Sequence, residues 1–331
     1  MKVIRSTEQL EGLTETVVPW QPQPSPVVES NADEWLMATH GRTFHFASRF
    51  LAPEIRREVV ILYAFFRTLD DLVDIPEEGR SIQDIRLELD TWKRWFLEGR
   101  SFPAPREPLG SRLSAVLTQR SVPTTIFLDF LEGMSFDLEP QHICDFSELY
   151  RYCYCVAGTV GLAMTHILGV KSDQALVAAQ NLGIAMQLTN ILRDIGGDLA
   201  LGRIYLPQED LERFGCSPDH LAQLYWNQRC DDRFRALMRF QVARAHHYYV
   251  RGMTGIWLLP RNYRFPILVA SRLYRRILAV IEHRDYDVLR SRASTSFPEK
   301  VREAAIAFML ERLWSRGESC LSPEVEVYLE N

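Results

Sequence analysis

Two pairs of aspartates carry the clearest chemical signal in this chain. Asp70 and Asp74 stand four residues apart, and Asp194 and Asp198 repeat that spacing further along. Residues three or four apart share one face of an α-helix, so each pair forms an acidic stripe. Both stripes interrupt apolar runs, where charge is costly unless a cation lies beside it. Carboxylates without His or Cys suit Mg²⁺, which commonly binds one or two of them together with phosphates. The stripes therefore predict a Mg²⁺–diphosphate site where their helices face each other.

Polar residues in register with the aspartates strengthen this interpretation. Arg67 shares a helix face with Asp70, and Gln187 and Asn190 share one with Asp194. The alternative is that each pair lies on a solvated helix face, as isolated acidic pairs usually do. The strongly apolar residues around both pairs argue against an exposed face.

Two further stretches have two interpretations each. The segment 202–207 contains Arg203 and Tyr205 and ends in proline. It is either a salt-bridged turn or a loop that brings a guanidinium group onto phosphate oxygens, because the planar fork of arginine binds two of them at once. The segment 150–161 is rich in tyrosine and then in small residues. It is either a close helix contact or an aromatic wall that stabilises positive charge.

The elements that must position these residues are helices. Helical periodicity dominates from Glu34 onward and strand-like alternation is scarce, which predicts a single-domain, all-α bundle at 34–320. The proline-rich residues 1–33 are expected to form an extended or disordered leader, and 321–331 a C-terminal tail. Helices are predicted at about 53–74, 81–97, 110–119, 123–137, 147–168, 172–198, 231–257, 265–285 and 298–315.

Composition narrows the class of protein. The net charge of −5 lacks the excess of basic residues that is typical of nucleic-acid-binding proteins, so no nucleic-acid partner is expected. Six cysteines lack a paired metal-ligand spacing, which favours reduced thiols in the cytoplasm. No apolar run reaches the ~18 residues of a membrane-spanning helix. We expect a cytoplasmic protein, with peripheral membrane contact left open, and no particular oligomeric state is indicated.

Taken together, these residues resemble the squalene/phytoene synthase family of head-to-head prenyl transferases. The likeness runs from about His40 to Lys300 and rests on five motifs in the expected order, at 40–44, 67–74, 152–161, 187–198 and 202–207. It implies an all-α isoprenoid-synthase fold with a central cavity, and prenyl diphosphate substrates.

The resemblance also implies a role for each motif residue. The metal ligands would be Asp70, Asp74, Asp194 and Asp198. Substrate would be bound by His40, Arg42, Arg67, Gln187, Asn190, Arg193 and Arg203. Tyr152 and Tyr274 would line the reaction centre. The expected cofactor is Mg²⁺, with Mn²⁺ as a substitute. One departure is Gly196-Gly197 between the second pair of aspartates, since two glycines cost about 1 kcal/mol each inside a helix and predict a loosened turn before Asp198.

Within the family, the stretch 273–294 is more similar to phytoene synthases than to squalene synthases. The implied reaction, part of carotenoid biosynthesis, is condensation of two C20 geranylgeranyl diphosphates to phytoene through a cyclopropyl diphosphate, without NADPH. A C30 synthase acting on C15 farnesyl diphosphate, with dehydrosqualene, presqualene diphosphate or squalene as product, shares every motif and stays open. A non-catalytic relative acting as an assembly factor is a further alternative, which the two intact aspartate pairs disfavour. The motifs at 152–161 and 202–207 do not fit a head-to-tail elongase.

Overall fold

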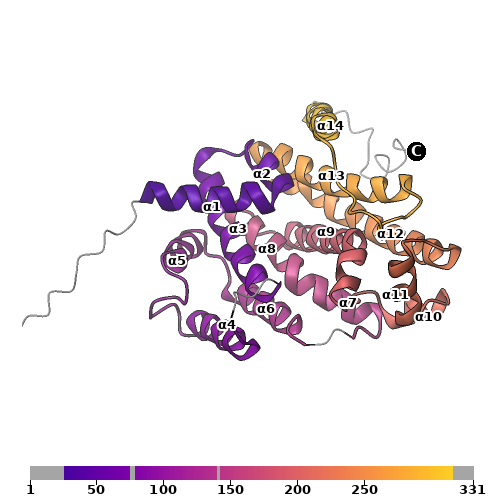
Figure 1. Ribbon diagram of the computed structural model, residues 1–331. Coiled ribbons are helices and arrows are strands. Elements are labelled where there is room, and N and C mark those ends of the chain that lie inside the picture. Colours follow the sequence, from indigo (N-terminus) through magenta and orange to yellow (C-terminus); the bar gives the residue numbers. More distant parts are fainter. Residues whose placement is uncertain (1–25, 75–78, 140–141, 316–331) are drawn as a thin grey trace, which may run out of the picture.

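The computed structural model describes residues 26–74, 79–139 and 142–315, and all regular structure in these ranges is helical. The helices surround a long central helix, α9, which Figure 1 shows near the middle of the molecule. The elements are α1 (Pro26–His40), α2 (Arg42–Ser48), α3 (Pro53–Asp74), α4 (Ile82–Leu97), α5 (Leu109–Arg120), α6 (Thr124–Phe136), α7 (Phe146–Cys153), a π-helical turn η1 (Tyr154–Gly158), α8 (Thr159–Ile167), α9 (Asp173–Ala200), α10 (Gln208–Arg213), α11 (Pro218–Asn227), α12 (Asp232–Met253), a 3₁₀ turn η2 (Thr254–Leu258), α13 (Arg261–His283) and α14 (Phe297–Ser315).

Helix α9 is the axis of the bundle. It begins at Asp173, and the hydroxyl of the preceding Ser172 caps it by accepting a hydrogen bond from the amide of Ala175. It packs against α12, α8, α13 and both short turns. Among the described residues it is the one helix long and apolar enough to cross a membrane by composition, yet 61% of that apolar window is buried inside the protein. Its apolar character is therefore that of a core helix.

Close helix contacts hold α9 in place. A Cβ atom added to Gly252 of α12 would lie 2.6 Å from the backbone nitrogen of Leu182 in α9. A Cβ on Gly161 of α8 would lie 2.4 Å from the carbonyl oxygen of Ala179. No side chain fits in either space, so glycine is what allows both neighbours to approach the helix that carries the second acidic stripe.

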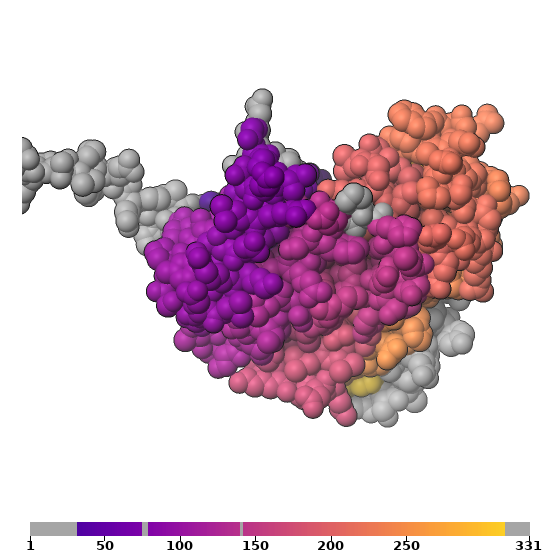
Figure 2. All heavy atoms as spheres, turned by 90° about the horizontal axis from the view of Figure 1, so that it is seen from below, coloured from indigo at the N-terminus to yellow at the C-terminus, as the bar shows by residue number. Residues whose placement is uncertain are grey.

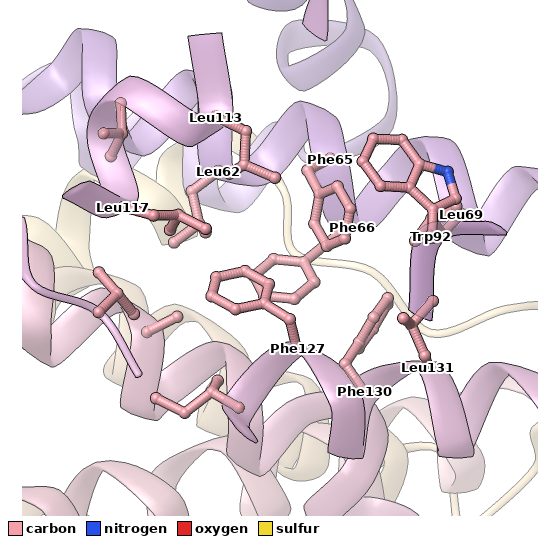
Figure 3. Packing of buried hydrophobic residues seen from close by; sticks show 14 of the residues in the cluster. Leu62, Phe65, Phe66, Leu69, Trp92, Leu113, Leu117, Phe127, Phe130 and Leu131 are labelled. Atoms are coloured by element: carbon pink, nitrogen blue, oxygen red, sulfur yellow. The ribbon is translucent and has the colours of Figure 1, made fainter. Parts of the chain in front are cut away.

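Aromatic packing fixes α3, the helix that carries the first acidic stripe. Phe65 packs edge-to-face against Trp92 of α4 at 5.2 Å between ring centroids. Phe66 stacks on Phe127 of α6 at 5.9 Å and meets Phe130 edge-on at 4.6 Å. Figure 3 shows these rings converging between the helices. The packing of one face of α3 orients its polar face, on which Asp70 and Asp74 lie.

The all-α fold is confirmed, and α3 has the predicted bounds. The predicted leader is wrong at its end, because α1 begins at Pro26 and residues 26–33 are helical. The rest of the leader and the predicted tail lie outside the described residues. The short helices α10 and α11 were not predicted.

The loosened turn predicted at Gly196-Gly197 is also wrong, since α9 continues unbroken to Ala200. The two glycines differ in their surroundings. A Cβ on Gly196 would lie 3.0 Å from the carbonyl oxygen of Val288, whereas a Cβ on Gly197 would meet nothing within 4 Å. Gly196 thus lets the segment after α13 pass close to α9.

Candidate active site

The first acidic stripe lies in the last turns of α3. The Arg67 guanidinium donates to Asp70 Oδ2 at 2.9 Å and also binds Asp71. Burial raises the pKa of Asp70 to about 7, and the nearby carboxylates of Asp74 and Asp71 act in the same direction against the charge of Arg67. Arg67 and Asp70, which the spacing places on one helix face, are thus in contact, and Asp71 is an additional partner of Arg67.

The second stripe begins with Asp194, which two arginines hold. Arg193 donates to its two carboxylate oxygens at 2.9 and 2.6 Å. Arg292, from the segment after α13, donates to the same oxygens at 2.6 and 2.8 Å. Burial alone would raise the pKa of Asp194, but the two guanidinium groups lower it below its usual value.

Arg203 joins the two stripes. Its Nη1 donates to Asp74 Oδ1 at 2.6 Å, and its backbone amide donates to the carbonyl oxygen of Asp198 at 2.8 Å. Burial raises the pKa of Asp198 to about 7, with further contributions from the charges of Asp194 and Asp74. The aspartate pairs therefore lie within electrostatic reach of each other.

A further carboxylate, that of Asp137 at the end of α6, lies near enough to both stripes to act on Asp70 and Asp198. It accepts hydrogen bonds of 3.0 Å from the hydroxyl groups of Tyr152 and Tyr205. Their rings stack at 5.2 Å between centroids. Burial raises the pKa of Asp137 to about 6, although the two tyrosine hydrogen bonds act in the opposite direction. Tyr152 thus lies beside the acidic cluster, next to a carboxylate that sequence reasoning missed.

An aromatic group adjoins the arginines of the second stripe. The Tyr274 ring lies 5.0 Å from that of Phe44, which lies 6.4 Å from Tyr63. Arg193 lies near enough to Tyr274 for its positive charge to act on the pKa of the Tyr274 hydroxyl, against the effect of burial. Burial raises the pKa of Tyr274, so its hydroxyl stays protonated at neutral pH. The structure therefore places Tyr274 next to the second acidic stripe.

The remaining predicted residues are less closely tied to the aspartates. Asn190 donates to Gln187 Oε1 at 3.1 Å, and its own Oδ1 is buried without a hydrogen-bond partner. The His40 ring meets Trp35 edge-on at 6.5 Å. Arg42 is exposed, and its charge adds to burial in lowering the pKa of Lys300. Within the described part of the chain, no hydrogen bond or ion pair joins His40 or Arg42 to the aspartates.

Two residues that contact the candidate site, Arg292 and Asp137, escaped the sequence analysis for different reasons. Arg292 is 98 residues from Asp194 and belongs to no helical stripe, so only the folded chain reveals the pairing. Asp137 follows a helix that carries Asp129 and Glu132, and nothing in its spacing from these acids distinguishes it from a surface residue.

The donor set is compatible with a cation held jointly with phosphates. In the described ranges, no three His, Cys, Asp or Glu residues already converge as a metal-holding cluster. Asp70 and Asp198 nevertheless have raised pKa values because they are buried and, in addition, lie near other carboxylates, and a divalent cation would relieve both effects. Since Mg²⁺ needs only one or two carboxylates besides phosphates and water, the oxygen donors of the two stripes fit it.

Figure 2 shows two raised lobes on one side of the molecule, with a hollow between them. The early helices form one lobe, and α10 to α12 form the other. On the described residues the molecule is an all-α bundle in which Arg203 connects its two acidic helices. The chain is a member of the squalene/phytoene synthase family, whose model matches residues 37–299.

Individual relatives agree with this assignment. The chain is 36% identical over 308 residues to the 15-cis-phytoene synthase of Synechocystis sp., with 87% of this chain and 89% of the relative covered. It is 35% identical to phytoene synthase 2, chloroplastic, of Solanum lycopersicum, with 86% and 91% covered. Among solved structures, it is similar to a dehydrosqualene synthase in complex with ligand, with a TM-score of 0.76, 28% identity and 87% and 99% covered. The protein is therefore a prenyl transferase that acts on prenyl diphosphates.

Proposed function

We propose that this enzyme condenses two geranylgeranyl diphosphates head to head and releases phytoene. The observation that carries the proposal is the similarity to phytoene synthases of cyanobacteria and plants, at 35–37% identity over more than four fifths of this chain. The aspartates and arginines described above supply the groups that such a reaction needs.

The reaction begins with departure of diphosphate from one substrate, which breaks a C–O bond and leaves an allylic cation. When bound, Mg²⁺ would supply charge neutralisation at the leaving diphosphate, held by Asp70, Asp74, Asp194 and Asp198. Three of these carboxylates now bind arginines: Asp70 binds Arg67, Asp74 binds Arg203, and Asp194 binds Arg193 and Arg292. Once the carboxylates have another cation as partner, these guanidinium groups are free to bind phosphate oxygens, where charge develops.

The carbon–carbon bonds form next. The double bond of the second substrate attacks the cation, a proton leaves, and a cyclopropyl diphosphate results. Departure of the second diphosphate, rearrangement and a second proton loss give the linear C40 product. The rings of Phe44, Tyr63 and Tyr274 place aromatic surface beside the arginines, where it stabilises a cation and excludes water. This sequence needs no hydride, so NADPH is not required.

A C30 synthase is the second candidate, because a dehydrosqualene synthase is among the similar solved structures. It would use the same charged groups with a C15 substrate. The higher identity to phytoene synthases, 36% against 28%, favours the C20 substrate.

Product analysis tests the proposal. Purified protein is incubated with geranylgeranyl diphosphate and MgCl₂, without NADPH, and with EDTA in a parallel sample. We expect phytoene in the hydrocarbon extract, two diphosphates released for each phytoene, and neither product with EDTA. Turnover that persists in EDTA contradicts the metal assignment, and the absence of any C40 hydrocarbon contradicts the proposed reaction.

A further inference from the structure

A cavity of about 540 Å³ lies at the amino-terminal end of α3, between α1, the end of α2 and α5. Arg57 in its wall is 13 residues from Asp70, which corresponds to about 20 Å along the helix axis. The cavity is therefore separate from the aspartate site at the other end of α3. Its volume lies within the range of about 300–1,000 Å³ typical of sites for small organic molecules.

The charged residues that line this cavity carry a net positive charge, because arginines outnumber acids among them. Four arginines line it, and two of them are paired with the two acids of α1: Arg112 binds Asp33 at 2.7 Å, and Arg56 binds Glu34. The other two, Arg49 and Arg57, are exposed, and no carboxylate in the described ranges pairs with either. Two guanidinium charges are thus left over, which matches a dianion.

The paired arginines also have unused donors. The Nε atoms of Arg56 and Arg112 are buried, and neither has a hydrogen-bond partner. A buried N–H group without a partner is costly, so a ligand or water that accepts from it is favoured. Each of these side chains is therefore paired with an acid of α1 and also has a buried Nε–H group without an acceptor.

The position of two of the arginines at the amino-terminal end of α3 also favours a bound anion. Arg56 and Arg57 follow Pro53, the first residue of α3, by three and four positions. The amino-terminal end of a helix carries the positive end of its dipole, which disfavours cations and favours anions. Two arginines placed there oppose the local helix preference, and a bound anion would remove that conflict.

From these observations we infer a second binding site in this cavity, for a small organic phosphate. Arg49 and Arg57 bind the phosphate oxygens, since the guanidinium fork matches phosphate geometry. Val60 and Ile61, which also line the cavity, contact the apolar part of the ligand. The site is independent of the catalytic reaction and of its metal.

Titration calorimetry on the full-length protein tests this inference. The probes are inorganic diphosphate, ADP as an organic diphosphate, and succinate as a dicarboxylate, all with EDTA so that no divalent cation recruits phosphate to the aspartates. The test variant is Arg49→Gln/Arg57→Gln. The matched control is Arg229→Gln/Arg251→Gln, which removes the same charge from two other exposed arginines.

We expect saturable binding of a phosphate probe, weakened at least about tenfold in the test variant and changed less than about twofold in the control. Tighter binding of ADP than of diphosphate supports the part given to the apolar residues. Absence of saturable binding, equal weakening in both variants, or preference for succinate overturns the inference. Circular dichroism and prenyl-transfer activity of the test variant should match the wild type, so a folding defect is distinguishable from loss of the site.

Discussion

The two adjacent glycines of α9 allow a matched pair of substitutions that tests how the second acidic stripe is held. The three atoms nearest to a Cβ added to Gly196 would all be backbone atoms: the carbonyl oxygens of Val288 and Leu289 at 3.0 and 3.2 Å, and Leu289 Cα at 3.3 Å. A Cβ on Gly197 would contact nothing within 4 Å. Backbone atoms cannot rotate away as side-chain ends do, so Gly196→Ala must displace the 288–289 segment.

The expected difference follows from two terms. Replacing glycine by alanine inside a helix stabilises it by about 1 kcal/mol, a gain common to both variants. Overpacking against fixed neighbours costs about 1–3 kcal/mol, and only Gly196→Ala incurs that cost. In a chain of this size 1 kcal/mol corresponds to about 2 °C, so Gly197→Ala should melt about 2–6 °C above Gly196→Ala.

The assay is thermal unfolding of both variants by circular dichroism, followed by prenyl-transfer kinetics. Leu289 lies three residues before Arg292, which holds Asp194 through two hydrogen bonds. We therefore expect a lower kcat/KM in Gly196→Ala than in Gly197→Ala. Equal melting temperatures would refute the close contact between α9 and this segment.

Three further predictions concern the charged groups. Asp70→Ala or Asp194→Ala should abolish turnover while the helical circular dichroism spectrum stays unchanged, and full activity in either variant would contradict the metal assignment. Arg292→Gln should lower kcat/KM about tenfold or more, because Asp194 loses a bidentate partner. The control is Arg290→Gln, which changes an arginine paired with another aspartate and should alter kcat/KM less than about twofold. Equal kinetics of the two variants would exclude a role for Arg292. The pKa values of Asp70 and Asp198, about 7, lie above the unfolded value near 4, so the metal-free folded protein binds more protons between these limits. Its melting temperature should therefore fall as pH rises from about 4 to 7 and then level off. Mg²⁺ should stabilise the protein more at pH 8 than at pH 6. A melting temperature that rises between about pH 4 and 7 would contradict the raised pKa values.

The sequence predicted the helical elements and the acidic stripes well because both depend on local spacing. Helix α3 has the predicted bounds, since proline opens it and its apolar period is regular up to Asp74. Arg67 and Asp70 meet because they are three residues apart on that helix. Helix bounds and contacts within one helix depend on residues a few positions apart, so the local sequence is sufficient to predict them.

What the sequence did not reveal depends on contacts between distant segments. Arg292 meets Asp194 across the turn after α13, and Asp137 meets Tyr205 from a different part of the chain. The glycine pair was misjudged because helix propensity is local, whereas the close passage of Val288 is a tertiary contact. The start of α1 was misplaced because the proline-rich composition before it masked the helical pattern.

The most direct test of the proposed reaction is a competition between substrates. The enzyme is given equal concentrations of the C15 and C20 prenyl diphosphates in one tube with Mg²⁺ and without NADPH, and the extracted hydrocarbons are measured by mass spectrometry. A C40 product that dominates at low conversion is the predicted result. A C30 product in excess would contradict phytoene synthesis and assign the enzyme to the dehydrosqualene branch of its family.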